Sequence, residues 1–288
     1  MLSRWLSLLA LVGCSYQPPA ATENGSPSND STAADAEVTD GEVPDSEAIV
    51  PILIDRGLVA RYFMDEAASG QLPSSLTDSA GSPQALPITY GQATFVETNG
   101  HRGLSFPASS STGMAEISLG GTKFITELAP KRTVTIEIVA QIAAAGGAGS
   151  ESQLAGLRGG NPDFMLTALG ANDLRFFRPF GSEGATWANA NTQQRMVLHL
   201  VFDSTRATES ERIELFKNGS ALTKTTSSPP VLNRTVGLGG GDKLMIGNSP
   251  GQNRSIQGTI FYVAYYNEAL DAAEIANNAT RLLANDDL

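Results

Sequence analysis

Residues 255–283 read SIQGTIFYVAYYNEALDAAEIANNATRLL and decide the fold. The run 259–266 is rich in aromatic and β-branched side chains, which suit a half-buried strand better than a helix. Residues 267–270 end this strand. Asp271 followed three residues later by Glu274 predicts a helix N-cap with a capping box. The helix that follows places three apolar residues on one face, which must dock on the rest of the protein: Ile275, Ala279 and Leu282.

This stretch resembles the closing strand of LamG-like domains of the concanavalin A-like lectin/glucanase superfamily. The matching residues are Gly258, Ile260, Val263, Tyr265, Ala269, Leu270, Glu274 and Ile275. Residues 58–65, 101–106, 133–142 and 196–219 resemble further strands of the same family, although the tryptophan that is usual in the third of these segments is absent. The resemblance covers roughly residues 58–283. It implies an all-β, two-sheet antiparallel jelly-roll sandwich of the concanavalin A-like type, with one short C-terminal helix.

The residues themselves favour the same class. With 29 glycines and 15 prolines in 288 residues, the chain favours many turns over many helices. Alternation in 133–142 predicts a central strand, and Asn218-Gly219 predicts a type I′ hairpin. Further strands are expected at 86–95, 153–157, 164–169, 174–177, 196–203, 212–217 and 243–247.

The formal net charge is −11, and no clustered basic stripe is present, which argues against nucleic acid as a partner. Eight of the acidic residues, and no Lys or Arg, lie within residues 15–54. Cys14 is the single cysteine, so an intrachain disulfide is not possible.

Residues 1–13 have a positive Arg4 followed by an apolar run too short to span a bilayer, which is typical of a signal peptide. Leu11-Val12-Gly13-Cys14 resembles the bacterial lipobox. The resemblance implies a lipid attached at Cys14 and a location at the bacterial cell envelope, in the outer membrane or at the cell surface. An ordinary cleavable signal, or a short anchor, with a chance cysteine is the alternative. We expect membrane contact through this lipid anchor alone.

We therefore predict three parts: a signal peptide with lipobox at 1–14, an acidic linker at 15–48 and a LamG-like domain at 49–288. The linker composition cannot bury enough apolar area to order itself, so disorder is expected there. A pro-segment or a partner-binding tail is the alternative for this region.

Two hydrolase patterns deserve comparison with the chain. Gly247-Asn248-Ser249-Pro250-Gly251 matches a nucleophile elbow, but no histidine follows it, so a plain turn is favoured. The jelly-roll glucanases space their carboxylates as Glu-x-Asp-x-x-Glu, and this spacing does not occur. The nearest approximations to this spacing are Glu209-Ser210-Glu211 and Glu137, which we expect to be solvated, or hairpin, charges. We therefore predict no catalytic residues in this chain.

Aromatic and basic residues cluster near residues 176–187. Phe177, Arg178 and Trp187 are the candidate ligand-binding residues, because aromatic rings stack on sugars and arginine holds carboxylates. Core packing is the alternative for this cluster. His199, inside an apolar strand, is expected to be a hydrogen-bonded core or rim residue.

Calcium is the only cofactor that the chain suggests, since loop oxygens of Asp and Asn suit this ion. The candidate ligands are Asp65, Asp203 and Asn248, with turn capping as the alternative role for each.

The sequence thus favours a non-enzymatic surface lipoprotein whose domain binds a glycan or an envelope or extracellular protein. A divergent glycosidase of the same superfamily and a purely structural envelope module are the alternatives.

Overall fold

The computed structural model describes residues 52–72, 74–90, 93–106, 113–143, 151–158, 164–178, 183–249 and 254–287. These residues belong to one compact unit, Ala48–Leu288. The predictions for the signal peptide, for Cys14 and for the linker lie outside the described residues. No helix within the described ranges is long and apolar enough to cross a membrane.

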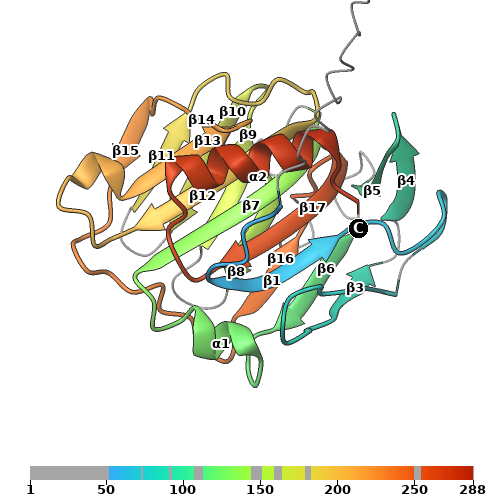
Figure 1. The fold of residues 1–288 in the computed structure, drawn as a ribbon, viewed down its shortest axis with the longest axis horizontal. Coiled ribbons are helices and arrows are strands. Elements are labelled where there is room, and N and C mark those ends of the chain that lie inside the picture. Colours follow the sequence, from blue (N-terminus) through green and yellow to red (C-terminus); the bar gives the residue numbers. More distant parts are fainter. Residues whose placement is uncertain are drawn as a thin grey trace, which may run out of the picture. The chain divides into compact units, whose positions relative to one another are not determined.

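The described strands form two antiparallel sheets, which confirms the predicted two-sheet sandwich (Figure 1). The first sheet has eight strands, in the order β14 (Ser220–Ala221), β13 (Ile213–Lys217), β12 (Met196–Asp203), β7 (Thr133–Ile142), β17 (Gly258–Tyr266), β5 (His101–Phe106) and β4 (Thr94–Thr98), with β1 (Leu58–Phe63) also pairing with β17.

The second sheet has nine strands. Their order is β15 (Thr226–Ser228), β11 (Glu183–Trp187), β10 (Asp173–Arg178), β9 (Phe164–Leu169), β8 (Glu151–Arg158), β16 (Lys243–Ile246), β6 (Met114–Ser118), β3 (Leu86–Tyr90) and β2 (Ser75–Leu76).

Strand β17, which belongs to the stretch quoted first from the sequence, lies in the interior of the eight-stranded sheet and pairs with three other strands. It pairs with β7 along its length, while β5 and β1 share its other edge end to end. The register shifts between Ile260 and Tyr262, where the edge passes from β5 to β1. Such a bulge lets two successive residues face the same side of the sheet, so Phe261 and Tyr262 both point away from the core between the sheets.

Aromatic rings from both sheets meet in this core. The ring of Phe164 on β9 lies 4.7 Å from that of Phe176 on β10 and 5.3 Å from that of Phe202 on β12, measured between centroids. All three side chains are fully buried. Edge-to-face contacts of this kind add to the burial of apolar area that holds a sandwich together.

Helix α2 (Ala272–Ala284) covers the outer face of the eight-stranded sheet over β12, β7 and β17 (Figure 1). The predicted capping box is confirmed, because the Asp271 side chain accepts hydrogen bonds from the backbone of Ala273 and Glu274, and the Glu274 side chain accepts one from the Asp271 backbone. The predicted apolar face is also confirmed, since Ile275, Ala279 and Leu282 are buried.

Residues 52–57 form a strap that is bonded to the same helix. The backbone N–H of Ile54 donates to Asn278 Oδ1 at 2.9 Å, and Asn277 Nδ2 donates to the Ile52 carbonyl at 2.8 Å. Arg56 is paired with Glu274 and Glu268. The entry to the domain and its C-terminal helix are therefore joined through side chains.

Most strand bounds agree with the prediction, but one predicted strand is wrong. Residues 86–95 were expected to form a single strand, whereas β3 belongs to the nine-stranded sheet and β4 to the eight-stranded one. The chain thus changes sheets between these two strands. A one-turn helix, α1 (Lys123–Glu127), and strands β6, β11 and β15 were not predicted.

Candidate functional site

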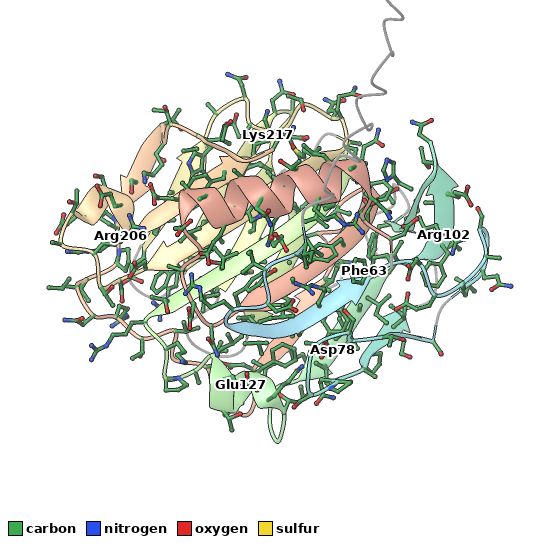
Figure 2. All side chains as sticks on the ribbon, viewed as in Figure 1. Phe63, Asp78, Arg102, Glu127, Arg206 and Lys217 are labelled. Carbon is green, nitrogen blue, oxygen red and sulfur yellow. The ribbon has the colours of Figure 1, made fainter. Side chains whose placement is uncertain are left out.

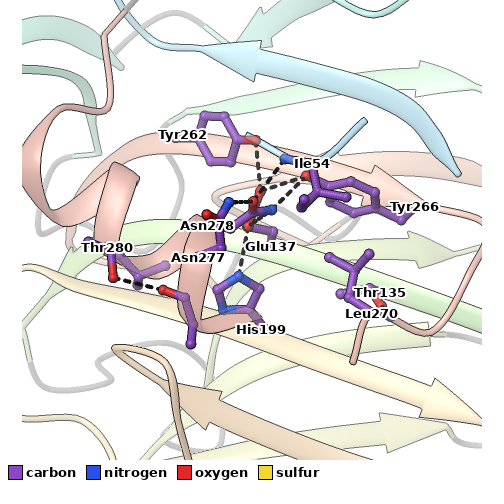
Figure 3. Close-up of polar contacts among 12 residues, drawn as sticks. Ile54, Thr135, Glu137, His199, Tyr262, Tyr266, Leu270, Asn277, Asn278 and Thr280 are labelled. Atoms are coloured by element: carbon purple, nitrogen blue, oxygen red, sulfur yellow. Dashed lines mark hydrogen bonds and ion pairs between the residues drawn. The ribbon is translucent and has the colours of Figure 1, made fainter. Parts of the chain in front are cut away.

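A buried polar network lies between α2 and the eight-stranded sheet (Figure 3). At its centre, Glu137 on β7 accepts hydrogen bonds from the hydroxyls of Tyr262 and Tyr266, at 2.8 and 2.9 Å. Asn278 Nδ2 of α2 donates to the same carboxylate at 2.9 Å, and His199 Nε2 lies 2.7 Å from it. Burial raises the pKa values of both tyrosines, so their hydroxyls stay protonated and donate.

The expectation that Glu137 is a solvated charge is therefore wrong, since the residue has no exposed surface. Burial by itself raises the pKa of its carboxyl. The hydrogen bond and charge of His199, together with the donors Tyr262 and Asn278, outweigh burial and lower that pKa below its ordinary value. His199 is a hydrogen-bonded core residue, as predicted. We assign the network to stability, because it fastens α2 to the sheet.

The cluster near residues 176–187 divides between the inside and the outside of the nine-stranded sheet. Trp187 and Arg178 are each 1% exposed and lie on the inner side. Arg178 Nη1 bonds to Glu183 at 3.1 Å, so its guanidinium already holds a carboxylate of the same chain. Both side chains are thus placed for packing and not for contact with a ligand. Phe177 is half-buried and, by alternation along β10, faces outward.

The outward face of β10 also carries Arg175, two residues before Phe177. Its guanidinium lies over the Phe177 ring, 4.4 Å from the centroid. Arg175 Nη1 bonds to Glu151 at 3.0 Å, and the same carboxylate accepts a bond from Arg254 Nη1 at 2.6 Å. The arginine side chain remains about a third exposed, at 32%. Ring and carboxylate therefore fix the orientation of a guanidinium that solvent can still reach.

A shallow cavity of about 310 Å³ opens beside this pair, between β10, β11 and β15. Gly184 lies directly across from Phe177 in the strand pairing. A Cβ at Gly184 would come within 2.7 Å of the Phe176 carbonyl oxygen, so the close approach of the two strands requires glycine here. Three hydroxyl-bearing residues on the same face as Arg175 and Phe177 form a wall of the cavity: Thr186, Thr226 and Ser228.

An arginine fork, an aromatic ring and a row of hydroxyls are the groups that can hold a polar, carboxylate-bearing ring compound. We name Arg175, Phe177, Glu151 and the hydroxyl wall the β10 face. Of these residues, Phe177 alone was a candidate from the sequence. Arg175 could have been found from the strand period, because residues two apart on a strand share a face. Glu151 and Arg254 join it only through tertiary structure.

The three candidate calcium ligands lie at different places in the fold. Asp203 ends β12 beside Thr133, the first residue of β7, whereas Asn248 follows β16 at the end of the sandwich where Gly247 contacts Phe106. Phe106 pairs with Gly258, which in turn pairs with Ile142, the last residue of β7. The length of β7, roughly 30 Å at ~3.3 Å per residue, therefore separates Asp203 from Asn248.

Asp65 lies in a third place, after β1, in a cavity that Arg102 also lines. Asp203 accepts bonds from Thr205 and Arg206. Figure 2 shows Arg102 and Arg206 on opposite sides of the sandwich. The three candidates therefore cannot share one cation.

Two of these residues form local turn contacts. Asp203 Oδ1 accepts from the Thr205 backbone and hydroxyl, and Asn248 Oδ1 accepts from the backbone N–H groups of Ser249 and Arg254. Within the described ranges, no group of three His, Cys, Asp or Glu side chains is arranged to hold a metal ion. Calcium binding by any of the three residues stays a prediction.

Ser249, the serine of the elbow-like sequence, is 2% exposed. It follows β16 and lies in a segment whose next residues, 250–253, are outside the described ranges.

Comparison with known proteins supports the fold. No protein family profile and no curated protein sequence matches the chain. Among solved structures, the binding domain of botulinum neurotoxin DC in complex with rat synaptotagmin II aligns over 79% of this chain and 52% of that chain, with a TM-score of 0.56 and 11% identity. The same domain in complex with SialylT aligns over 78% of this chain and 52% of that one, with a TM-score of 0.54 and 11% identity.

A sialidase from Trypanosoma rangeli, in complex with 2,3-difluorosialic acid, aligns over 78% of this chain with a TM-score of 0.54 and 18% identity. This chain covers 33% of the sialidase. It therefore spans about half of the toxin chain and a third of the sialidase. At these identities the likeness shows a shared jelly-roll-like sandwich.

Proposed function

We propose that the domain is a non-catalytic, LamG-like carbohydrate-binding module that recognises a carboxylate-bearing sugar on its β10 face. The observation that carries the proposal is the Arg175 guanidinium held over Phe177 and by Glu151 while a third of the side chain stays exposed. A guanidinium that is already held in place loses little side-chain conformational entropy when it binds a ligand carboxylate. Figure 1 shows that α2 covers the eight-stranded sheet, so the helix does not cover the β10 face, which belongs to the nine-stranded sheet.

The charges on this face suit an acidic ligand. Glu151 is shared by two arginines, Arg175 and Arg254, so the three side chains together carry one net positive charge. Glu183, which also lines the cavity, is paired with Arg178 and with Arg234. A sugar carboxylate at Arg175 therefore meets a cation, and the hydroxyl wall can bond to the ring hydroxyls.

Two of the three solved structures of similar fold support the ligand class, since one holds SialylT and the other holds 2,3-difluorosialic acid. The other toxin complex contains a protein, rat synaptotagmin II. A glycan is therefore our first choice of partner, and an envelope or extracellular protein is the second.

We further propose that this module is a lipoprotein of the bacterial cell envelope, in the outer membrane or at the cell surface. Support comes from the lipobox resemblance at Cys14 and the acidic composition of residues 15–48. The domain begins with the strap, which lies on the α2 side of the sandwich. The β10 face lies on the outer side of the opposite sheet. A tether joined to the strap would therefore leave this face free to meet a ligand.

Substitution of Phe177 or Arg175 tests the proposal. We expect Phe177→Ala and Arg175→Gln each to weaken binding to an acidic glycan at least tenfold, about 1.4 kcal/mol. Arg175→Lys should also weaken it, because lysine keeps the charge but lacks the planar fork. The measurement is a screen of the full chain in detergent against sialylated, uronic-acid and neutral oligosaccharides, with calcium and again with chelator.

The matched control is Arg206→Gln, which removes a half-exposed, ion-paired arginine at the Asp203 turn. Its affinity should equal that of the unchanged chain. Equal affinity of Phe177→Ala and the unchanged chain would refute the β10 face as the binding site. Turnover of a bound glycan would instead favour the glycosidase alternative, and a blank screen would favour a protein partner or a structural module.

A further inference from the structure

Another cavity, of about 390 Å³, opens on the outer face of the eight-stranded sheet. Six residues line it: Gln141, Ala143, Gln193, Gln257, Gly258 and Thr259. Gln141 on β7 pairs directly with Thr259 on β17. Val139, the previous outward residue of β7, belongs to the cluster beneath α2. The cavity therefore occupies the end of the sheet that the helix leaves uncovered.

A chain of hydrogen bonds holds the walls of this cavity in place. The N–H of Ala143 donates to the Gln257 carbonyl at 3.1 Å. Asn191, which is 2% exposed, donates through Nδ2 to the Ala143 carbonyl and accepts through Oδ1 from the Gln193 N–H. Gln141 Nε2 lies 3.3 Å from the Gln193 carbonyl. The three segments that carry the glutamines are thus fixed relative to one another.

Two of the wall residues have an unusual backbone. Gln193 has φ of 59° and Gln257 has φ of 48°, both in the left-handed region. The other non-glycine residues with positive φ in the described ranges are asparagines, which tolerate this region well. Glutamine does not share that tolerance, so glycine or asparagine would be less strained at either position. Backbone strain of this kind is often retained where the side chain has a function.

The chemistry of the walls selects the class of ligand. Carboxamides donate and accept hydrogen bonds, as sugar hydroxyls do, and no charged side chain is among the six lining residues. An acidic ligand would find no cation here. The volume is within the range of small-molecule sites.

We propose that this cavity, which we name the glutamine pocket, is a second binding site and that it takes an uncharged sugar unit. The carboxamides of Gln141, Gln193 and Gln257 bond to its hydroxyls, with the Thr259 hydroxyl at the rim. The pocket and the β10 face lie on different sheets, so the two sites bind independently.

The experiment uses glycine substitutions, which remove the carboxamide and relieve the strain together. Binding of maltohexaose, cellohexaose and laminarihexaose to the full chain in detergent is measured by titration calorimetry, and thermal unfolding is followed in parallel. At least one neutral hexasaccharide should bind. Gln193→Gly and Gln257→Gly should each weaken that binding at least tenfold, while the midpoint of unfolding stays equal or rises.

Two controls separate this site from the β10 face and from general effects of glycine. Asn99→Gly changes another residue with positive φ, 54°, in the turn between β4 and β5, and should leave binding unchanged. Arg175→Gln should weaken the binding of acidic glycans and leave the binding of the neutral hexasaccharides unchanged. The pocket is refuted if none of the three hexasaccharides binds, or if the glutamine variants gain stability at unchanged affinity.

Discussion

Replacing Glu137 with leucine is expected to lower the free energy of unfolding by about 3–5 kcal/mol, the usual effect of removing one partner from a buried ionic network. The substitution leaves the hydroxyls of Tyr262 and Tyr266 and the amide of Asn278 without their acceptor. His199 also loses its partner in a fully buried position. Urea denaturation followed by circular dichroism measures the change.

Glu116→Leu is the matched control for this substitution. Glu116 pairs with Lys243 on the outer side of the other sheet, and the lysine side chain is 38% exposed. Pairs of this kind contribute about 0–1 kcal/mol. Similar losses in the two variants would mean that Glu137 does not hold α2 as the hydrogen bonds indicate.

The same carboxylate gives the domain an acid-sensitive component of stability. The pKa of Glu137 is lower in the folded chain than its ordinary value of 4.5. Its ionised form therefore stabilises the fold above pH 4.5, and this contribution decreases as the pH falls through the folded pKa. We expect the stability gap between the unchanged chain and Glu137→Gln to narrow as the pH falls below 4.5. Urea midpoints over this range measure it, and a gap that widens in acid would contradict the assignment.

Replacing Trp187 with alanine should lower the free energy of unfolding by about 3–5 kcal/mol, the range for large aromatic side chains in cores. Trp187 is 1% exposed and belongs to the core between the sheets. Phe177→Ala, on the outer face of the neighbouring strand, should cost no more than about 1 kcal/mol. Chemical denaturation of both variants compares the two sides of the sheet.

Fluorescence gives an independent check on Trp187. The chain has two tryptophans, Trp5 and Trp187, and Trp5 lies in the predicted signal peptide. In a chain without the signal peptide, the emission should be that of a buried indole and should shift to the red on unfolding. A red-shifted emission in the folded chain, typical of a solvent-exposed indole, would mean that Trp187 lies on the surface.

The parts of the fold that the sequence predicted are those where local and tertiary preferences agree. The bounds of β7 and β12 were predicted at 133–142 and 196–203, because both are long, apolar strands. The N-cap of α2 was predictable because Asp271 and Glu274 satisfy the first turn of the helix locally.

The elements that were missed are short or lack β-forming residues. Strand β11 contains glutamate, glycine and alanine, which are uncommon in strands, and it is held by its neighbours β10 and β15. The division of 86–95 into two strands depends on a change of sheet, which residue type alone does not specify.

The candidate sites were even less predictable from the sequence than these strands, because they depend on tertiary contacts. The environment of Glu137 is created by α2, which begins more than 130 residues later in the chain. Composition singled out the region around Phe177 as a candidate site but did not reveal which side chains face outward. The glutamine pocket joins residues from three separate segments, and its strained backbone has no counterpart in the sequence pattern.

The strap at residues 52–57 has a mechanical consequence. If the chain is tethered through its N-terminal segment and a ligand is held on the β10 face, tension enters the domain at the strap. The bonds to Asn277 and Asn278 and the Arg56 ion pairs would carry this load first. Release of the strap would then expose β1, whose pairing with β17 would have to be broken next. The domain would therefore yield in steps under force, and the first step would lengthen the tether while both sheets stay intact.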